Sequence, residues 1–212
     1  MLFDRQDAGI QLAAALQTYH NQKDTIVIGL PRGGVVLAYE ISKRLNLSLD
    51  ITCPRKIGAP HNQEFAIGAI TETGHGIFNT ELIRELKISK NYLEEEVARE
   101  KSIAQHRLKT YRQHLPPRNL KGKSIILVDD GLATGATMEA AIESVKSEGA
   151  IKIIVAVPIA PKETVMKIEK LVDEVICLET PYPFYAIGEF YSTFPQVEDE
   201  QVIALLKTTR YT

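Results

Sequence analysis

The chain has 212 residues, of which 44% are hydrophobic and 25% are charged, a composition typical of a globular protein. Its formal net charge of -2 at pH 7 argues against a generally basic surface that would hold a nucleic-acid backbone. Since no run approaches the roughly 20 apolar residues that span a bilayer, we expect no nucleic-acid or membrane partner and a cytoplasmic location.

The first part of the chain alternates between helical and strand patterns. A helical stripe comes first, formed by Leu12, Ala15, Leu16 and Tyr19. A β-rich apolar run over residues 25–30 follows, and Pro31 and Gly33 close it. A second helical stripe then precedes a strand over residues 47–53, and consists of Leu37, Ile41 and Leu45. This βαβ pattern predicts parallel strands joined by a right-handed crossover.

Residues 54–120 interrupt the alternation and are predicted to form an insertion. They contain a Gly-containing stretch that we expect to be mobile, then an apolar segment over residues 82–86 and a charged helix over about 92–111. Asn91 followed by Glu94 fits a capping box at the start of that helix. We therefore expect one domain over residues 1–212 that carries a helical, hood-like insertion.

The alternation resumes after residue 120. A buried-type strand over 124–128 leads into a helix that Gly149 ends, and a further strand occupies 151–157. Pro161 suits the first turn of the next helix, and a last strand covers 174–178. The chain is therefore predicted to form an α/β fold, an open and mostly parallel sheet with helices on both faces. Ligands of such sheets bind at the carboxyl ends of the strands.

The segment 125–137, IILVDDGLATGAT, passes directly from a buried strand into a helix. Its backbone can curl around an anion at five mostly small residues, Ala133, Thr134, Gly135, Ala136 and Thr137. Asp129 and Asp130 would repel a nearby phosphate unless they face sugar hydroxyls or a metal-bound sugar. A phosphorylated ribose meets both demands. The alternative is a tight turn in which one carboxylate caps the next helix.

The same segment resembles the phosphoribosyl pyrophosphate signature of type I phosphoribosyltransferases, and the whole chain resembles their stand-alone bacterial relatives. The resemblance implies transfer of 5-phosphoribosyl from phosphoribosyl pyrophosphate to a nitrogen nucleophile such as a nucleobase, with release of pyrophosphate. It implies that Asp129 and Asp130 hold the ribose hydroxyls and, indirectly, a Mg²⁺ cofactor, while residues 133–137 hold the 5-phosphate. The alternative function is a regulator that binds the donor without turning it over.

A second Gly-containing loop, Pro31-Arg32-Gly33-Gly34, also connects a strand to a helix. By itself it fits an ordinary βα turn with a surface arginine. It resembles the pyrophosphate loop of the same family, which implies that Arg32 meets the charge of the leaving group and that Gly33 and Gly34 approach the donor. In that family the peptide bond before the second residue of this loop is often cis.

Two further elements bear on the acceptor. Arg55 and Lys56 resemble the start of the flexible loop of orotate-type enzymes, which implies donor binding by Arg55 and a catalytic role for Lys56. A solvated basic pair is the alternative, and the further Lys and His-Gly of the orotate version are missing. Residues 180–188 are similar to the base-stacking segment of hypoxanthine-guanine phosphoribosyltransferases, so Phe184 or Tyr185 would stack on an aromatic acceptor, with core packing an equal alternative. The acceptor stays open, and a homo-oligomer is compatible with the sequence.

Overall fold

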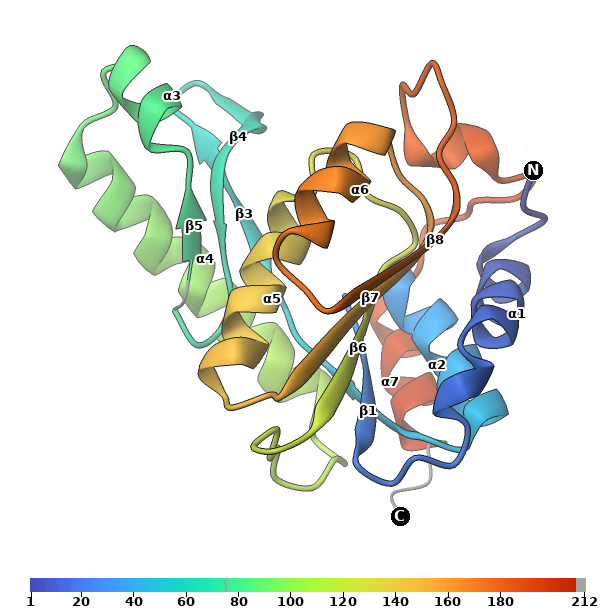
Figure 1. Ribbon diagram of the computed structural model, residues 1–212. Helices are drawn as coiled ribbons and strands as arrows, with labels where there is room; N and C mark the ends of the chain where they lie inside the picture. Colours follow the sequence, from blue (N-terminus) through green and yellow to red (C-terminus); the bar gives the residue numbers. More distant parts are fainter. Residues whose placement is uncertain (75, 209–212) are drawn as a thin grey trace.

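A five-stranded parallel sheet forms the centre of the molecule in the computed structural model, which describes residues 1–74 and 76–208 (Figure 1). Its strand order is β2-β1-β6-β7-β8, and every neighbouring pair is parallel. The strands are β1 (Thr25–Gly29), β2 (Ser48–Ile51), β6 (Ser124–Val128), β7 (Lys152–Ile159) and β8 (Glu174–Glu179). The predicted open parallel sheet is therefore confirmed.

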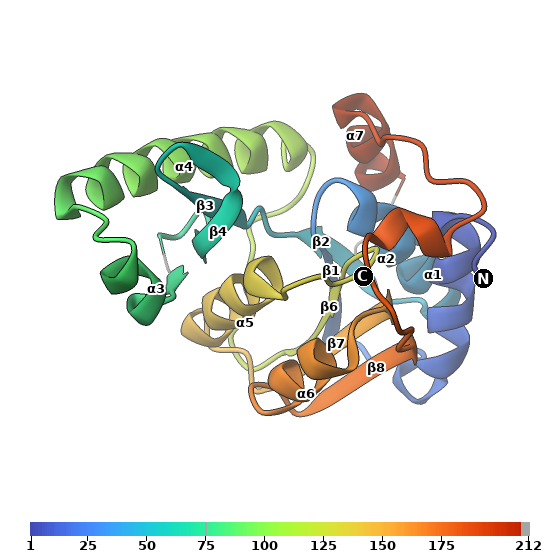
Figure 2. The same cartoon turned by 90° about the horizontal axis from the view of Figure 1, so that it is seen from above.

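Helices cover both faces of this sheet (Figure 2). One face carries α1 (Arg5–Ala15), α2 (Gly33–Leu45) and α7 (Asp199–Lys207), and the other carries α5 (Ala136–Ser147) and α6 (Lys162–Glu169). Successive residues of a strand point to opposite faces, so Ile126 of β6 packs toward α2 while Ile125 and Leu127 pack toward α5. This explains why the central strands carry continuous apolar runs after their first residue rather than apolar residues at alternate positions.

The insertion differs from its predicted form. It contains a three-stranded antiparallel sheet of β3 (Arg55–Ala59), β4 (Asn62–Ile70) and β5 (Gly76–Phe78), followed by α3 (Thr80–Glu85) and α4 (Lys90–Tyr111). The expectation of a loop after residue 54 is wrong, because the stretch forms these strands, and their Ile57, Ile67 and Ile70 are buried against side chains of α3 and α4. Residues 55–111 are called the hood below.

The long hood helix also begins at a different residue from the predicted one. α4 starts at Lys90, and the hydroxyl of Ser89 accepts a hydrogen bond from the backbone N–H of Tyr92 at 3.2 Å. Ser89 is therefore the N-cap, and the capping box predicted at Asn91 and Glu94 is wrong because Asn91 already lies in the first turn. At the other end of α4, Tyr111 is buried in the main core and joins the hood to it.

The C-terminal part crosses back over the first face of the sheet. After β8 the chain forms a short 3₁₀ helix, Ile187–Phe190, pairs Tyr191 with Leu2, and then forms α7, which the sequence analysis did not predict. Within the described residues, no helix combines the length and the apolar character needed to cross a membrane.

Candidate functional site

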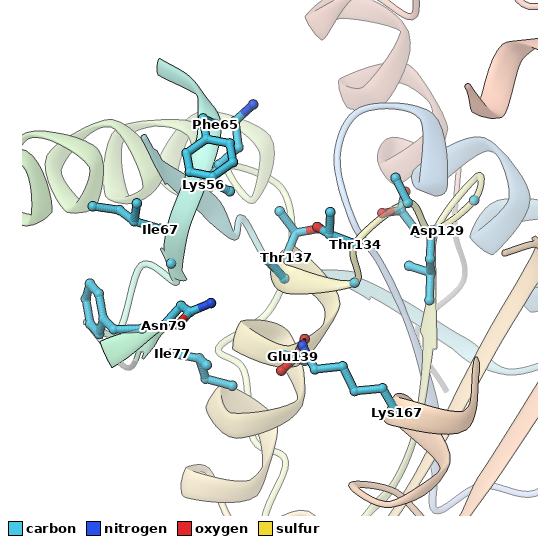
Figure 3. Close-up of a pocket in the computed structure, with 18 of the residues that line it drawn as sticks. Lys56, Phe65, Ile67, Ile77, Asn79, Asp129, Thr134, Thr137, Glu139 and Lys167 are labelled. Atoms are coloured by element: carbon cyan, nitrogen blue, oxygen red, sulfur yellow. The ribbon is translucent and has the colours of Figure 1, made fainter. Parts of the chain in front are cut away.

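A cavity of about 720 Å³ lies at the carboxyl end of β6, between the segment 129–137 and the hood (Figure 3). The core side of its wall contains residues 129–137 together with Glu139, Lys167 and Ile187. The hood side includes Lys56, Phe65, Ile67, Ile77, Phe78 and Asn79. One wall is thus rich in carboxylates, hydroxyls and small residues, and the opposite wall is largely apolar.

The acidic pair at the end of β6 occupies two different environments. The Asp129 carboxylate is half-buried and accepts a hydrogen bond from the backbone N–H of Asp130 at 2.8 Å. Its burial, together with the adjacent charge of Asp130, holds the pKa of Asp129 well above its ordinary value. The Asp130 carboxylate has its own counterion, because Nε of Arg5 donates to its Oδ2 at 2.7 Å.

Arg5 is a site residue that the sequence analysis missed. Its Nη1 donates to the carbonyl of Pro195 at 2.6 Å, and its guanidinium lies 3.7 Å from the centre of the Phe194 ring. The hydroxyl of Tyr191 donates to the backbone carbonyl of Asp130 at 2.7 Å from the same side. Arg5 and Asp130 are 125 residues apart, and no local pattern around Arg5 marks it as a partner of the acidic pair.

The loop that follows the acidic pair leads into the N-terminus of α5, and its conformation is fixed by Gly135 and by a hydrogen bond from α6. Gly135 adopts a left-handed conformation with φ of 80° immediately before the helix, where a side chain would be strained. The hydroxyl of Thr164 donates to the carbonyl of Ala133 at 2.7 Å and anchors the loop to α6. Thr134 is exposed and Thr137 is half-buried, and both line the cavity. Such a loop at a helix N-terminus suits an anion such as a phosphate.

The glycine loop after β1 packs directly against the acidic pair. The peptide bond between Pro31 and Arg32 is cis, as the family resemblance implies. A Cβ at Gly33 would lie 1.8 Å from Oδ2 of Asp130, so only glycine permits this approach. A Cβ at Gly34 would lie 2.6 Å from the carbonyl oxygen of Val128. The glycine loop 31–34 and the segment 129–137, both predicted from the sequence, are therefore in direct contact.

The side chain of Arg32 points to α7. Its Nη1 lies 3.5 Å from Oε2 of Glu198 and 3.7 Å from Oδ1 of Asp199, and the side chain is 29% exposed. Within the described part of the chain, the cavity lining does not include Arg32, Gly33 or Gly34. An anion that recruits Arg32 must therefore compete with the two carboxylates at the start of α7.

Arg55 and Lys56 are separated by the geometry of β3. Neighbouring residues of a strand face opposite sides, and here Lys56 lines the cavity while Nε of Arg55 donates to Oε2 of Glu100 on α4 at 2.6 Å. The predicted flexible loop is thus replaced by a strand. Among the described residues of the cavity lining, Lys56 is present and Arg55 is not.

The two predicted aromatic rings after β8 do not reach this cavity. Phe184 stacks on Phe190 with ring centres 5.3 Å apart, and Tyr185 is 79% exposed. Neither ring belongs to the lining formed by the described residues, whereas Ile187 of the same segment does. The aromatic side chains at the cavity are Phe65 and Phe78, which the sequence analysis missed because their strands were interpreted as a loop.

Glu139 and Lys167 form a second charged pair at the base of the cavity, with Nζ of Lys167 2.5 Å from Oε1 of Glu139 (Figure 3). Both residues were missed. Their signal is the helical spacing that places Glu139 in the first turn of α5, directly after the loop. Lys167 comes from α6, and its position depends on how that helix packs.

The described residues contain no group of three or more His, Cys, Asp or Glu side chains that could hold a metal ion. Mg²⁺ often uses only one or two protein carboxylates and takes its other ligands from water and substrate phosphates. Asp129 and Asp130 fit that pattern for an ion that arrives with a phosphorylated sugar, although Arg5 already occupies Oδ2 of Asp130.

Comparisons with known proteins agree with this geometry. The chain matches the family model of the phosphoribosyl transferase domain over residues 2–191. It is 39% identical over 203 residues to a Mycobacterium tuberculosis protein that carries the provisional name of a phosphoribosyl transferase, and the match covers 96% of this chain and 46% of that protein. The chain therefore spans about half the length of the curated relatives it matches.

Two other similarities differ in extent. The crystal structure of the protein TT1426 from Thermus thermophilus superposes with a TM-score of 0.83 at 42% identity and covers 99% of both chains. A uracil phosphoribosyltransferase of Mycoplasma genitalium is 40% identical over 55 residues, which are 26% of this chain and 27% of that protein. The first similarity extends over the hood as well as the core, and the second is local.

Proposed function

Since the chain belongs to the phosphoribosyltransferase family, we propose that it transfers 5-phosphoribosyl from phosphoribosyl pyrophosphate to a nitrogen nucleophile and releases pyrophosphate. The observation that carries this proposal is the shared cavity of the acidic pair and the anion loop. Asp129 and Asp130 line this cavity together with Thr134 and Thr137. Figure 3 shows Asp129 on the same side of the cavity as the two threonines. A ribose that carries a 5-phosphate suits this arrangement, because its hydroxyls can bind the carboxylates and its phosphate can bind the loop that carries the threonines.

In the proposed reaction, the acceptor nitrogen forms a bond to C1 of the ribose while the bond from C1 to the pyrophosphate oxygen breaks. Positive charge grows on the sugar ring and negative charge grows on the leaving group, so the protein contributes by positioning and electrostatics. The Asp129 and Asp130 carboxylates accept hydrogen bonds from the ribose hydroxyls, and the N-terminus of α5 receives the 5-phosphate. No protein nucleophile takes part.

Arg32 is assigned to the pyrophosphate end of the donor. Its loop packs on the acidic pair through Gly33 and Gly34, and this contact supports a position for the leaving group next to the proposed ribose subsite. The assignment requires the Arg32 guanidinium to leave Glu198 and Asp199, from which it is separated by 3.5 and 3.7 Å. When Mg²⁺ is bound with the donor, it neutralises the phosphate oxygens and lowers their repulsion from the acidic pair.

The acceptor subsite is proposed to lie against the hood. Phe65, Ile67, Ile77 and Phe78 give this wall an apolar surface that suits a flat nitrogen heterocycle, and Lys56 and Asn79 add polar groups at its edge. The local similarity to a uracil phosphoribosyltransferase supports the inclusion of pyrimidines among the candidates.

The experiment that tests the proposed function is a pyrophosphate-release assay with phosphoribosyl pyrophosphate, Mg²⁺ and a panel of purines, pyrimidines, orotate and simple amines. We expect release that depends on one member of the panel and that is lost in Asp129→Asn/Asp130→Asn. Donor binding without acceptor-dependent release would instead favour a regulator that senses phosphoribosyl pyrophosphate.

A further inference from the structure

We propose that Arg5 is a positioning residue that holds the Asp130 carboxylate in the orientation required by the donor ribose, an inference that rests on the proposed function. Arg5 begins α1, far from the two predicted loops in sequence, yet its Nε lies 2.7 Å from Oδ2 of Asp130. Among the described residues, Arg5 is the one side chain that forms an ion pair with this carboxylate.

The Arg5 side chain is fixed by three independent contacts. Nε bonds Asp130, Nη1 bonds the Pro195 carbonyl at 2.6 Å, and the guanidinium plane rests 3.7 Å from the centre of the Phe194 ring. Only 11% of the Arg5 side chain is exposed. A guanidinium held at several points loses little further freedom when it binds a carboxylate, so it can define the position of that carboxylate.

The surroundings of Asp130 explain why such a contact is needed. Asp129 presents a second carboxylate beside it, and the two groups repel each other. Gly33 approaches so closely that an added Cβ would lie 1.8 Å from Oδ2 of Asp130 and 2.8 Å from Nε of Arg5. Arg5, Asp130 and the glycine loop therefore meet at one point. Because Arg5 engages Oδ2, Oδ1 of Asp130 is the oxygen assigned to the ribose hydroxyl.

The test is a calorimetric titration of ribose 5-phosphate into the full chain and into three single variants. Arg5→Gln removes the charge and Arg5→Lys keeps it. Gln6→Ala is the matched control, because Gln6 is the next residue of α1 and donates to Glu40 of α2 at 3.1 Å without touching the acidic pair. We expect affinity to fall about 10-fold in Arg5→Gln, less in Arg5→Lys, and not at all in Gln6→Ala.

A double-mutant cycle with Asp130→Asn separates positioning from a general structural effect. If Arg5 acts through Asp130, Arg5→Gln causes no further loss of ribose 5-phosphate affinity in the Asp130→Asn background. Additive losses would overturn the inference, and so would an Arg5→Gln variant that binds as tightly as the wild type. If Arg5→Gln does not fold, the same cycle is run with Arg5→Lys, whose smaller loss must also vanish in that background.

Failure of the proposed function gives a different pattern. A folded wild type that binds no ribose 5-phosphate would contradict the donor site itself and the Arg5 inference with it. A wild type that binds, together with Arg5 variants that bind equally well, would contradict the role of Arg5 alone. Melting temperatures of all variants show whether each one is folded at the temperature of the titration. A loss of affinity found only in variants that are unfolded at that temperature would also overturn the positioning role.

Discussion

At the scale of single residues, the acidic pair combines one carboxylate with a counterion and one without. Asp130 is paired with Arg5 at 2.7 Å, whereas Asp129 accepts a hydrogen bond from the backbone N–H of Asp130 and forms no ion pair among the described residues. Burial and the charge of Asp130 raise the pKa of Asp129. Ionised Asp129 therefore lowers the stability of the folded, ligand-free protein relative to a neutral side chain of the same shape at this position. Such a cost is expected for a carboxylate whose role is to bind a ligand.

This asymmetry predicts opposite effects of two conservative substitutions. Because the folded-state pKa of Asp129 is raised, its contribution to stability is complete below about pH 4, the ordinary value for Asp, and is lost as the pH rises through the folded-state pKa. Asp129→Asn should therefore be at least as stable as the wild type at pH 7.5, with a difference that shrinks toward pH 4. Urea unfolding at both pH values measures this.

The matched substitution, Asp130→Asn, should destabilise the protein by about 2 kcal/mol at pH 7.5, because it leaves the buried Arg5 guanidinium without its charged partner. A large loss of stability in Asp129→Asn would show that Asp129 supports the fold, and it would contradict the assignment of that carboxylate to a ligand.

Arg32→Ala should lower turnover by about 100- to 1000-fold while it leaves ribose 5-phosphate affinity unchanged, because Arg32 is assigned to charge that grows on the leaving group. Steady-state kinetics with the acceptor found in the screen, and titration of ribose 5-phosphate, give the two values. Arg44→Ala is the control, since Arg44 lies in the last turn of α2, the helix that begins directly after Arg32, and pairs with Glu40. Parallel losses in turnover and binding would mean that Arg32 supports the loop rather than the reaction.

At the scale of elements, the two loops of the parallel sheet could be predicted because the residues that define each loop are adjacent in the sequence. Strand, acidic pair, small residues and helix follow one another within residues 125–137, and the Gly33 loop has the same order. The hood sheet was missed because Gly58 and Gly68 interrupt its apolar residues, so β3 and β4 do not show the alternation of an exposed sheet.

Other elements show why sequence patterns alone were not enough. The α7 signal was present, since Val202 and Leu206 are four residues apart and buried, but it was not recognised. The contact between Arg5 and Asp130 carried no such signal, because a pairing of residues 125 positions apart depends on how α1 packs on the sheet. The opposite orientations of Arg55 and Lys56 likewise depend on β3 being a strand, which the sequence pattern did not indicate.

Substitutions at the start of α4 distinguish the observed N-cap at Ser89 from the predicted capping box at Asn91. Ser89→Ala should destabilise the protein by about 1 kcal/mol, because it leaves the N–H of Tyr92 without its acceptor. Asn91→Ala is the control and should change stability by less than about 0.5 kcal/mol, since Asn91 lies within the first turn. Thermal or urea unfolding distinguishes the two, and a larger effect at Asn91 would contradict the observed start of the helix.

At the scale of the whole molecule, buried ion pairs fix the hood relative to the sheet. Arg118 is only 8% exposed and lies between Glu72, at 3.3 Å, and Glu148 at the end of α5. Arg112, just after α4, binds Asp50 of β2 through two hydrogen bonds of 2.8 and 2.9 Å. Removal of one partner would leave a buried charge, so these pairs favour one placement of the hood. The cavity is thereby held between two defined walls.

The central claim is that the loop after β6 binds phosphoribosyl pyrophosphate, and calorimetric titration of that donor in the presence of Mg²⁺ tests it most directly. We predict saturable binding to the wild type, and at least about 10-fold weaker binding to Thr134→Val/Thr137→Val, whose hydroxyls line the cavity (Figure 3). Thr18→Val is the control, because Thr18 is exposed and lies far from the cavity in sequence, on the short 3₁₀ helix Gln17–Tyr19 that follows α1. Absence of binding to the wild type, or equal affinity in all three proteins, would contradict the claim.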